Sequence, residues 1–245
     1  MKNNKTFIIC SLILCFAIIN PSVAQFKVNK DFKKLIPKKK DDLSTTEVTK
    51  GLKEALVKGV TKGAKKASAT DGFNKNKLIR IPFPDDMQKV KNKLNSIGMS
   101  KLVNDFELSL NRAAEKSAKK ATPIFVNAIN TMSVDDARGV LKGGNRSATT
   151  YLKKTTTNDL TDSFNPVVKE SLDEADATKY FDQIVTRYNK IPFVDKVNPN
   201  LEEYATEKTI DGLFTLVGQE EEKIRKDPAA RTSDTMKKVF NKDNW

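Results

Sequence analysis

Apolar residues recur with helical spacing along most of the chain beyond residue 43. Between residues 48 and 60, four apolar side chains stand four positions apart, which is typical of one face of an α-helix. Ser44 and Glu47 form the S-x-x-E pattern of a capping box and predict where this helix begins. No stretch shows convincing alternation of apolar and polar residues with turn signals. We therefore predict an all-α fold, a compact multi-helix bundle in a single domain over residues 44–245.

Prolines, glycines and capping residues divide this pattern into segments. Asp71-Gly72 and nearby prolines predict a loop from about residue 68 to residue 84. Pro166 predicts a break between a helix that carries Tyr151 and another that reaches residue 172. The stretch 201–226 is expected to be the longest helix of the chain.

Two short segments of the chain resemble each other. Ile-Pro-Phe occurs at residues 81–83 and again at residues 191–193, beside a predicted helix each time. We expect Phe83 and Phe193 each to pin a linker to the core. The flanking residues do not match, so the pair does not indicate a repeat protein.

The first 24 residues have the pattern of a signal peptide. A positive head with Lys2 and Lys5 precedes an apolar run at residues 7–19, and a small-residue S-x-A site follows at residues 22–24. The run is short for a bilayer span, so we expect no transmembrane segment in the mature chain and a location in the periplasm. An uncleaved anchor helix and a lipoprotein acylated at Cys15 are the alternatives.

A lysine-rich arm is predicted at residues 25–43, after the signal peptide. Like charges in such a block repel one another, which favours a flexible tether. The arm is either a solvated linker or a contact for an anionic surface or partner. Its candidate contact residues are Lys27, Lys30, Lys33, Lys34, Lys38, Lys39 and Lys40.

Composition restricts the chemistry of the mature chain. The sequence has no histidine, and both cysteines, Cys10 and Cys15, lie in the signal peptide. Catalysis by Ser-His-Asp or Cys-His groups is therefore excluded, and the usual zinc, copper and haem sites lose their ligands. Adjacent carboxylates on one helix point about 100° apart, so they do not converge on a substrate. We expect no catalytic residues, no cofactor and no metal.

One glycine-rich segment is a candidate anion site. Residues 142–147 read KGGNRS, and a Gly-Gly turn that enters a helix can present backbone N–H groups to an anion, with Arg146 assisting. The alternative is structural: the end cap of one helix followed by the start of the next.

Four blocks of sequence together resemble the family of exported proteins known as domain of unknown function 4197 (DUF 4197). They are GLKEAL at residues 51–56, LNRAAEKSAKKATPIF at 110–125, DDARGVLKGGNRSATTYLK at 135–153, and the segment 204–240 that begins YATEKTIDGLF. Their order and number carry the resemblance. It implies a compact helical bundle and brings no established enzyme activity.

Polar residues within these blocks suggest a structural network. Asn111, Arg112 and Glu115 stand three and four positions apart on an alanine-rich helix and are expected to form a buried network between helices. A second set is expected to lock the long helix to the last one. Its members are Asp211, Glu221, Arg225 and Arg231.

The chain is also similar to the plug subunit of the type 9 secretion translocon, and this narrower resemblance implies a partner. It suggests a non-catalytic periplasmic protein that binds an outer-membrane β-barrel protein and closes the periplasmic end of its pore. The formal net charge of +13 favours anionic partners, but export argues against nucleic acid. An envelope enzyme or carbohydrate-binding factor that uses carboxylates, and a peripheral protein that binds anionic lipid, are the alternatives.

Overall fold

The computed structural model describes residues 44–194, 196 and 200–241, so the predicted signal peptide and lysine-rich arm lie outside the described residues. Within this part of the chain the structure has helices and no strand, which confirms the predicted all-α bundle. The helices are α1 (Thr45–Ser68), η2 (Asp85–Met87), α2 (Gln88–Ser96), α3 (Ser100–Ala118), α4 (Ala121–Thr131), α5 (Val134–Lys142), α6 (Ser147–Glu174), α7 (Ala177–Asn189), α8 (Leu201–Lys226), η3 (Pro228–Ala230) and α9 (Asp234–Val239).

Capping boxes set the start of two helices, the first of them where the sequence predicts it. Ser44 accepts a hydrogen bond from the backbone N–H of Glu47 at 3.2 Å, and the Glu47 carboxylate accepts one from the N–H of Ser44 at 3.0 Å. Ser133 and Asp136 form the same reciprocal pair at the start of α5. Each box satisfies N–H groups that have no partner within their helix.

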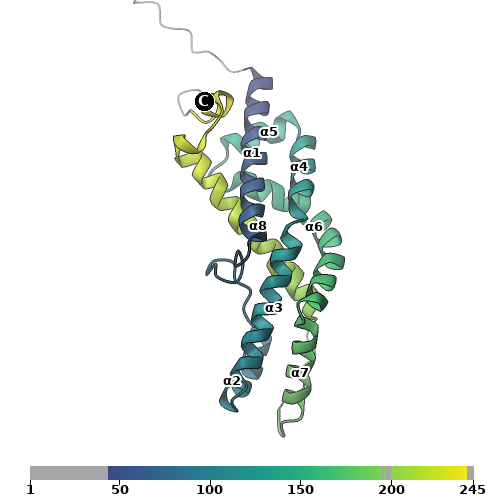
Figure 1. Cartoon of the computed structure of the whole chain (residues 1–245). Helices are drawn as coiled ribbons and strands as arrows, with labels where there is room; N and C mark the ends of the chain where they lie inside the picture. Colours follow the sequence, from purple (N-terminus) through teal and green to yellow (C-terminus); the bar gives the residue numbers. More distant parts are fainter. Residues whose placement is uncertain (1–43, 195, 197–199, 242–245) are drawn as a thin grey trace, which may run out of the picture. The chain divides into compact units, whose positions relative to one another are not determined.

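Helices α1 and α8 pack against each other in the centre of the bundle, and α3, α4 and α6 surround them (Figure 1). Gly63 allows the close approach of α1 to α8. A Cβ atom at this position would lie 3.1 Å from the backbone nitrogen of Val217. The core that these helices enclose is apolar and continuous, with five phenylalanine side chains among its fully buried members.

Pro166 does not end a helix, contrary to the prediction. It lies inside α6, which has 28 residues and exceeds the 26 residues of α8, so α8 is not the longest helix. Phe164 and Val168 are buried on either side of the proline. Their burial outweighs the one backbone hydrogen bond that proline cannot donate.

The two Ile-Pro-Phe segments differ in structure. Phe83 is fully buried and meets Phe106 edge-to-face, with 5.3 Å between ring centroids. Phe193, in contrast, is fully exposed and has a φ of 64°. The prediction is therefore correct for Phe83 and wrong for Phe193. Side chains of α3 hold the backbone around Phe83, whereas Phe193 follows the end of α7.

Candidate functional site

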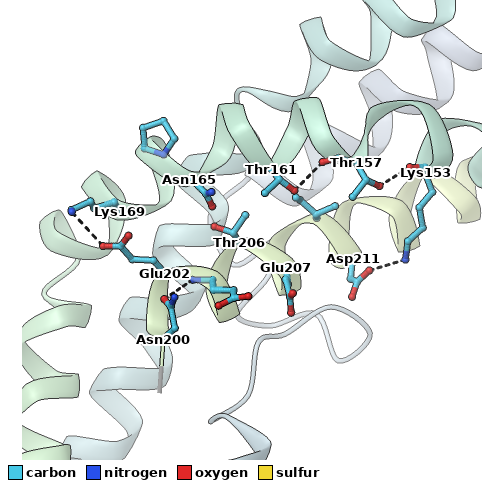
Figure 2. A pocket seen from close by; sticks show the side chains of 13 residues that line it. Lys153, Thr157, Thr161, Asn165, Lys169, Asn200, Glu202, Thr206, Glu207 and Asp211 are labelled. Carbon is cyan, nitrogen blue, oxygen red and sulfur yellow. Dashed lines mark hydrogen bonds and ion pairs between the residues drawn. The ribbon is translucent and has the colours of Figure 1, made fainter. Parts of the chain in front are cut away.

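An open groove with a volume of about 840 Å³ lies between α6 and α8 (Figure 2). Small polar side chains stand where larger apolar ones would fill the space between the helices. Its lining consists of Lys153, Thr157, Thr161, Asn165, Pro166, Lys169, Asn200, Glu202, Glu203, Thr206, Glu207, Ile210 and Asp211. No sequence signal apart from the four-residue spacing on α6 marks this site.

An ion pair joins the two walls at each end of the groove. Lys153 of α6 lies 3.0 Å from Asp211 of α8, and Lys169 lies 3.6 Å from Glu202 (Figure 2). All four side chains are about half exposed, so each pair contributes little to stability. The pairs mark the ends of a polar surface that the two helices share.

Thr206 of α8 lines the groove and is an exception among the buried threonines. Its side chain is 2% exposed, and its hydroxyl has no hydrogen-bond partner among the described residues. The buried hydroxyls of Thr156 and Thr209 donate to the backbone carbonyl four residues earlier, at 2.7 and 2.6 Å. A buried hydroxyl without a partner costs free energy, which distinguishes Thr206 from the other threonines of the core.

Carboxylate and amide side chains of α3 hold the loop between α1 and η2. The Glu115 carboxylate accepts hydrogen bonds from the backbone N–H groups of Phe73 and Asn74, at 3.1 and 3.2 Å. Asn111 accepts from the N–H of Ile81 and donates to its carbonyl, both at 2.8 Å. These residues therefore join a helix to a loop, and not helix to helix as predicted.

Glu107 belongs to the same row and was missed by sequence reasoning. It accepts hydrogen bonds from the N–H of Phe83 at 3.3 Å, and from Lys91 and Arg80 at 2.6 Å each. Burial raises the pKa of this carboxyl, but the hydrogen bonds from Lys91 and Arg80 lower it more, so its pKa lies below the ordinary value. Its position four residues before Asn111 was the available signal.

Arg112 completes this cluster at the start of the loop. Its guanidinium donates to Glu115 at 2.6 Å and to Asp71 at 2.7 Å. Hydrogen bonds from Lys75, Asn74 and Arg112 lower the pKa of Asp71. The cluster therefore keeps the Asp71 carboxylate ionised, and Arg112 ties it to α3.

Glu221 and Arg225 join α8 to the junction of α5 and α6, not to the last helix. Glu221 accepts from the backbone N–H of Ala148 at 3.0 Å, while Arg225 donates to the carbonyl of Val140 at 2.7 Å and the hydroxyl of Ser147 at 2.6 Å. A carboxylate meets the N-terminus of α6 and a guanidinium meets the C-terminus of α5. Both placements are favourable for helix dipoles.

This arrangement also decides between the two interpretations of residues 142–147. Gly143 caps α5, and Arg146, with a φ of 68°, precedes α6. The N-terminus of α6 does hold an anion, but the anion is the chain's own Glu221. The segment therefore works as a pair of helix caps.

Asp211 and Arg231 contact neither Glu221 nor each other, and each has different partners. Asp211 pairs with Lys153 across the groove. Arg231 donates to the carbonyls of Ile224 and Arg225 at 2.9 and 2.8 Å, and its guanidinium lies 5.9 Å from the ring centroid of Phe240. Arg231 therefore does link the end of α8 to the residue after α9, but the four predicted residues do not form one network.

The most buried carboxylates of the described residues serve the fold. Glu107, Glu115 and Glu221 all accept hydrogen bonds from backbone N–H groups and from basic side chains. Glu220, the fourth, pairs with Lys66. Within residues 44–194, 196 and 200–241, no group of three or more acidic residues is placed to hold a metal ion, and no helix is both long and apolar enough to cross a membrane.

A model of the family described as "Protein of unknown function (DUF4197)" matches residues 42–241. No curated protein and no solved structure matches the chain.

Proposed function

The chain belongs to the DUF4197 family of proteins of unknown function, and from this premise we propose that it is a non-catalytic binding protein of the periplasm. Its partner is an outer-membrane β-barrel protein. The specific case is that the helical bundle plugs the periplasmic end of a type 9 secretion translocon pore. A rigid bundle suits this role, because it can close an opening from the aqueous side.

Phe193 is the observation that supports the proposal most. A fully exposed aromatic ring is costly in water, and a φ of 64° is unfavourable for a residue with a Cβ atom. Aromatic side chains are enriched at the energetic centres of protein interfaces. Ile97, 52% exposed, lies in the turn after α2, and α2 packs against α7, which ends four residues before Phe193. The ends of α2 and α7 lie at the same end of the bundle (Figure 1).

The most buried carboxylates are engaged by the chain itself, which favours a structural role over catalysis for these residues. General acid–base chemistry needs a carboxyl that is free to gain and lose a proton at its substrate. Glu107, Glu115 and Glu221 instead accept several hydrogen bonds each from the chain itself. The buried charge of this domain therefore supports a rigid shape.

Affinity purification from detergent-solubilised membranes tests the proposal. The exported protein should bring down one large β-barrel protein in near-equal amount. Phe193→Ala should weaken this capture roughly 30-fold, because interface anchors contribute on the order of 2 kcal/mol. Leu78→Ala is the matched control, since Leu78 is 67% exposed and belongs to the loop before η2.

Two results would contradict the proposal. Recovery of lipid alone, or of no partner, would remove the β-barrel partner. Equal loss of capture in Phe193→Ala and Leu78→Ala would show that general surface hydrophobicity, and not the end of α7, drives the interaction.

A further inference from the structure

The groove between α6 and α8 is acidic on a basic chain. Its lining holds four carboxylates, of Glu202, Glu203, Glu207 and Asp211, against two lysines, so its net charge is −2 while the whole chain carries +13. Both lysines are used in the end pairs with Asp211 and Glu202. Among the described residues, no ion pair reaches Glu203 or Glu207.

Glu203 and Glu207 stand four apart on α8, which places them side by side on one face of the helix. Like charges at this spacing destabilise a helix by a few tenths of a kcal/mol. A cation between the two side chains would relieve this repulsion. The pair therefore favours a positively charged ligand.

The other polar groups of the groove also favour a ligand rich in hydrogen-bond donors. Thr157 and Thr161 already donate their hydroxyl protons to backbone carbonyls, at 2.5 and 2.9 Å, so they have acceptor lone pairs to offer. The buried Thr206 hydroxyl has no partner among the residues that the structure describes, and Thr206 lies between Asn165 and Glu207 in Figure 2. An unpaired buried hydroxyl in the lining is an observation independent of the acidic residues.

The shape of the groove suits a chain better than a small molecule. The end pairs involve Lys153 and Lys169, sixteen positions apart on α6, which corresponds to about 24 Å at 1.5 Å per residue. An extended peptide covers this length with about seven residues. The groove is open along this length, and side chains of both helices line it (Figure 2).

We infer that this groove binds an extended basic peptide, with a lysine or arginine side chain held between Glu203 and Glu207. Backbone N–H groups of the peptide would donate to Thr157 and Thr161. The inference rests on the proposed function for the source of the peptide, which is a segment of the partner protein.

Fluorescence anisotropy with three labelled heptapeptides tests the inference on the exported protein. The peptides share a Gly–Ser backbone and carry three lysines, three glutamates or no charge. The lysine peptide should bind, with an affinity that falls as salt rises, and the other two should not. Glu203→Gln combined with Glu207→Gln should weaken binding at least tenfold.

A matched variant controls for overall charge. Asp159 and Asp162 are exposed on α6 outside the groove, so Asp159→Asn combined with Asp162→Asn makes the same change in net charge. This variant should bind the lysine peptide like the wild type. Equal losses in the two double variants, or equal binding of the three peptides, would overturn the inference. Spermidine that displaces the lysine peptide with a similar dissociation constant would also overturn it, because the occupant would then be a small amine.

The peptide assay and the capture experiment test the two proposals separately. If the lysine peptide does not bind but the β-barrel protein is still captured, the inference about the groove is overturned and the proposed partner is supported. If the peptide binds through Glu203 and Glu207 but no β-barrel protein is captured, the inference about the groove is supported and the proposed partner is overturned.

Discussion

The carboxylate of Glu221 accepts two hydrogen bonds from Thr149, one from the backbone N–H at 2.8 Å and one from the hydroxyl at 2.7 Å. The two residues belong to α8 and to the first turn of α6. Arg225 also pairs with this carboxylate at 2.9 Å. Glu221 is only 6% exposed, so its buried charge is balanced by a basic partner. The contact fixes where α6 begins relative to α8, and both helices form the groove.

Glu221→Gln should lower the free energy of unfolding by about 2–3 kcal/mol, because the neutral amide leaves Arg225 without its partner and turns a donor towards other donors. Urea unfolding followed by circular dichroism measures this change. Glu222→Gln is the control, since Glu222 is more exposed and pairs with Lys226; it should change stability by less than about 0.5 kcal/mol. Equal effects of the two variants would contradict the role given to Glu221.

Gly63→Ala and Gly139→Ala should have opposite effects on stability. A Cβ atom at Gly63 would lie 3.1 Å from the backbone nitrogen of Val217, so the alanine separates α1 from α8. Gly139, on α5, has nothing within 4 Å of such an atom, so alanine should stabilise the helix by about 0.5–1 kcal/mol. Gly63→Ala should destabilise by about 1–3 kcal/mol. Thermal unfolding of the two variants checks both signs, and a stabilised Gly63→Ala protein would contradict the close packing of α1 on α8.

Thr206→Val should raise the stability of the free protein by about 1 kcal/mol. The substitution keeps the shape of the side chain and removes a buried hydroxyl that has no partner. Thr209→Val is the comparison, because Thr209 is equally buried but donates to the carbonyl of Ala205, so it should gain less. Urea unfolding of the two variants gives the difference. A loss of stability in Thr206→Val would mean that the hydroxyl has a partner after all.

Stability should be nearly independent of pH between about 5.5 and 8 and should fall in acid. The chain has no histidine, the side chain that ordinarily titrates in this range. Folding lowers the pKa of Glu107 below its ordinary 4.5, so the stability that its ionised form gives is fully present above that value. It is lost as the pH falls below about 4.5 through the pKa of the folded state.

Urea unfolding at a series of pH values measures this dependence. Glu107→Gln should be less stable at pH 7 by roughly 1–3 kcal/mol and should lose less stability in acid than the wild type. Parallel curves for the two proteins would show that other carboxyls cause the fall.

Most of the fold follows from local sequence, because caps and apolar spacing act within a few residues. The capping box at Ser44 and the loop before η2 are where the sequence predicts them. Pro166 is the counterexample: its local effect is overcome by the burial of Phe164 and Val168, which depends on helices distant in sequence.

The site was less predictable, because its partners are distant in the chain. Asn111 and Glu115 were recognised as structural from their spacing, but nothing local shows that their partners are the backbone of Ile81 and Phe73. The groove depends on where α6 and α8 lie side by side, and Thr206 is notable only for a missing partner. Such features exist only in three dimensions.

The row of Glu107, Asn111 and Glu115 on α3 has a consequence for which positions can change in sequence. These three side chains hold the backbone of the loop before η2, so an exposed loop side chain that makes no such contact adds little to the shape of the loop. Exposed positions such as Leu78 can therefore diverge among related proteins without unfolding the loop, whereas a change on the α3 face would release it. The loop can thus acquire new surface chemistry while the helix beneath it keeps its sequence.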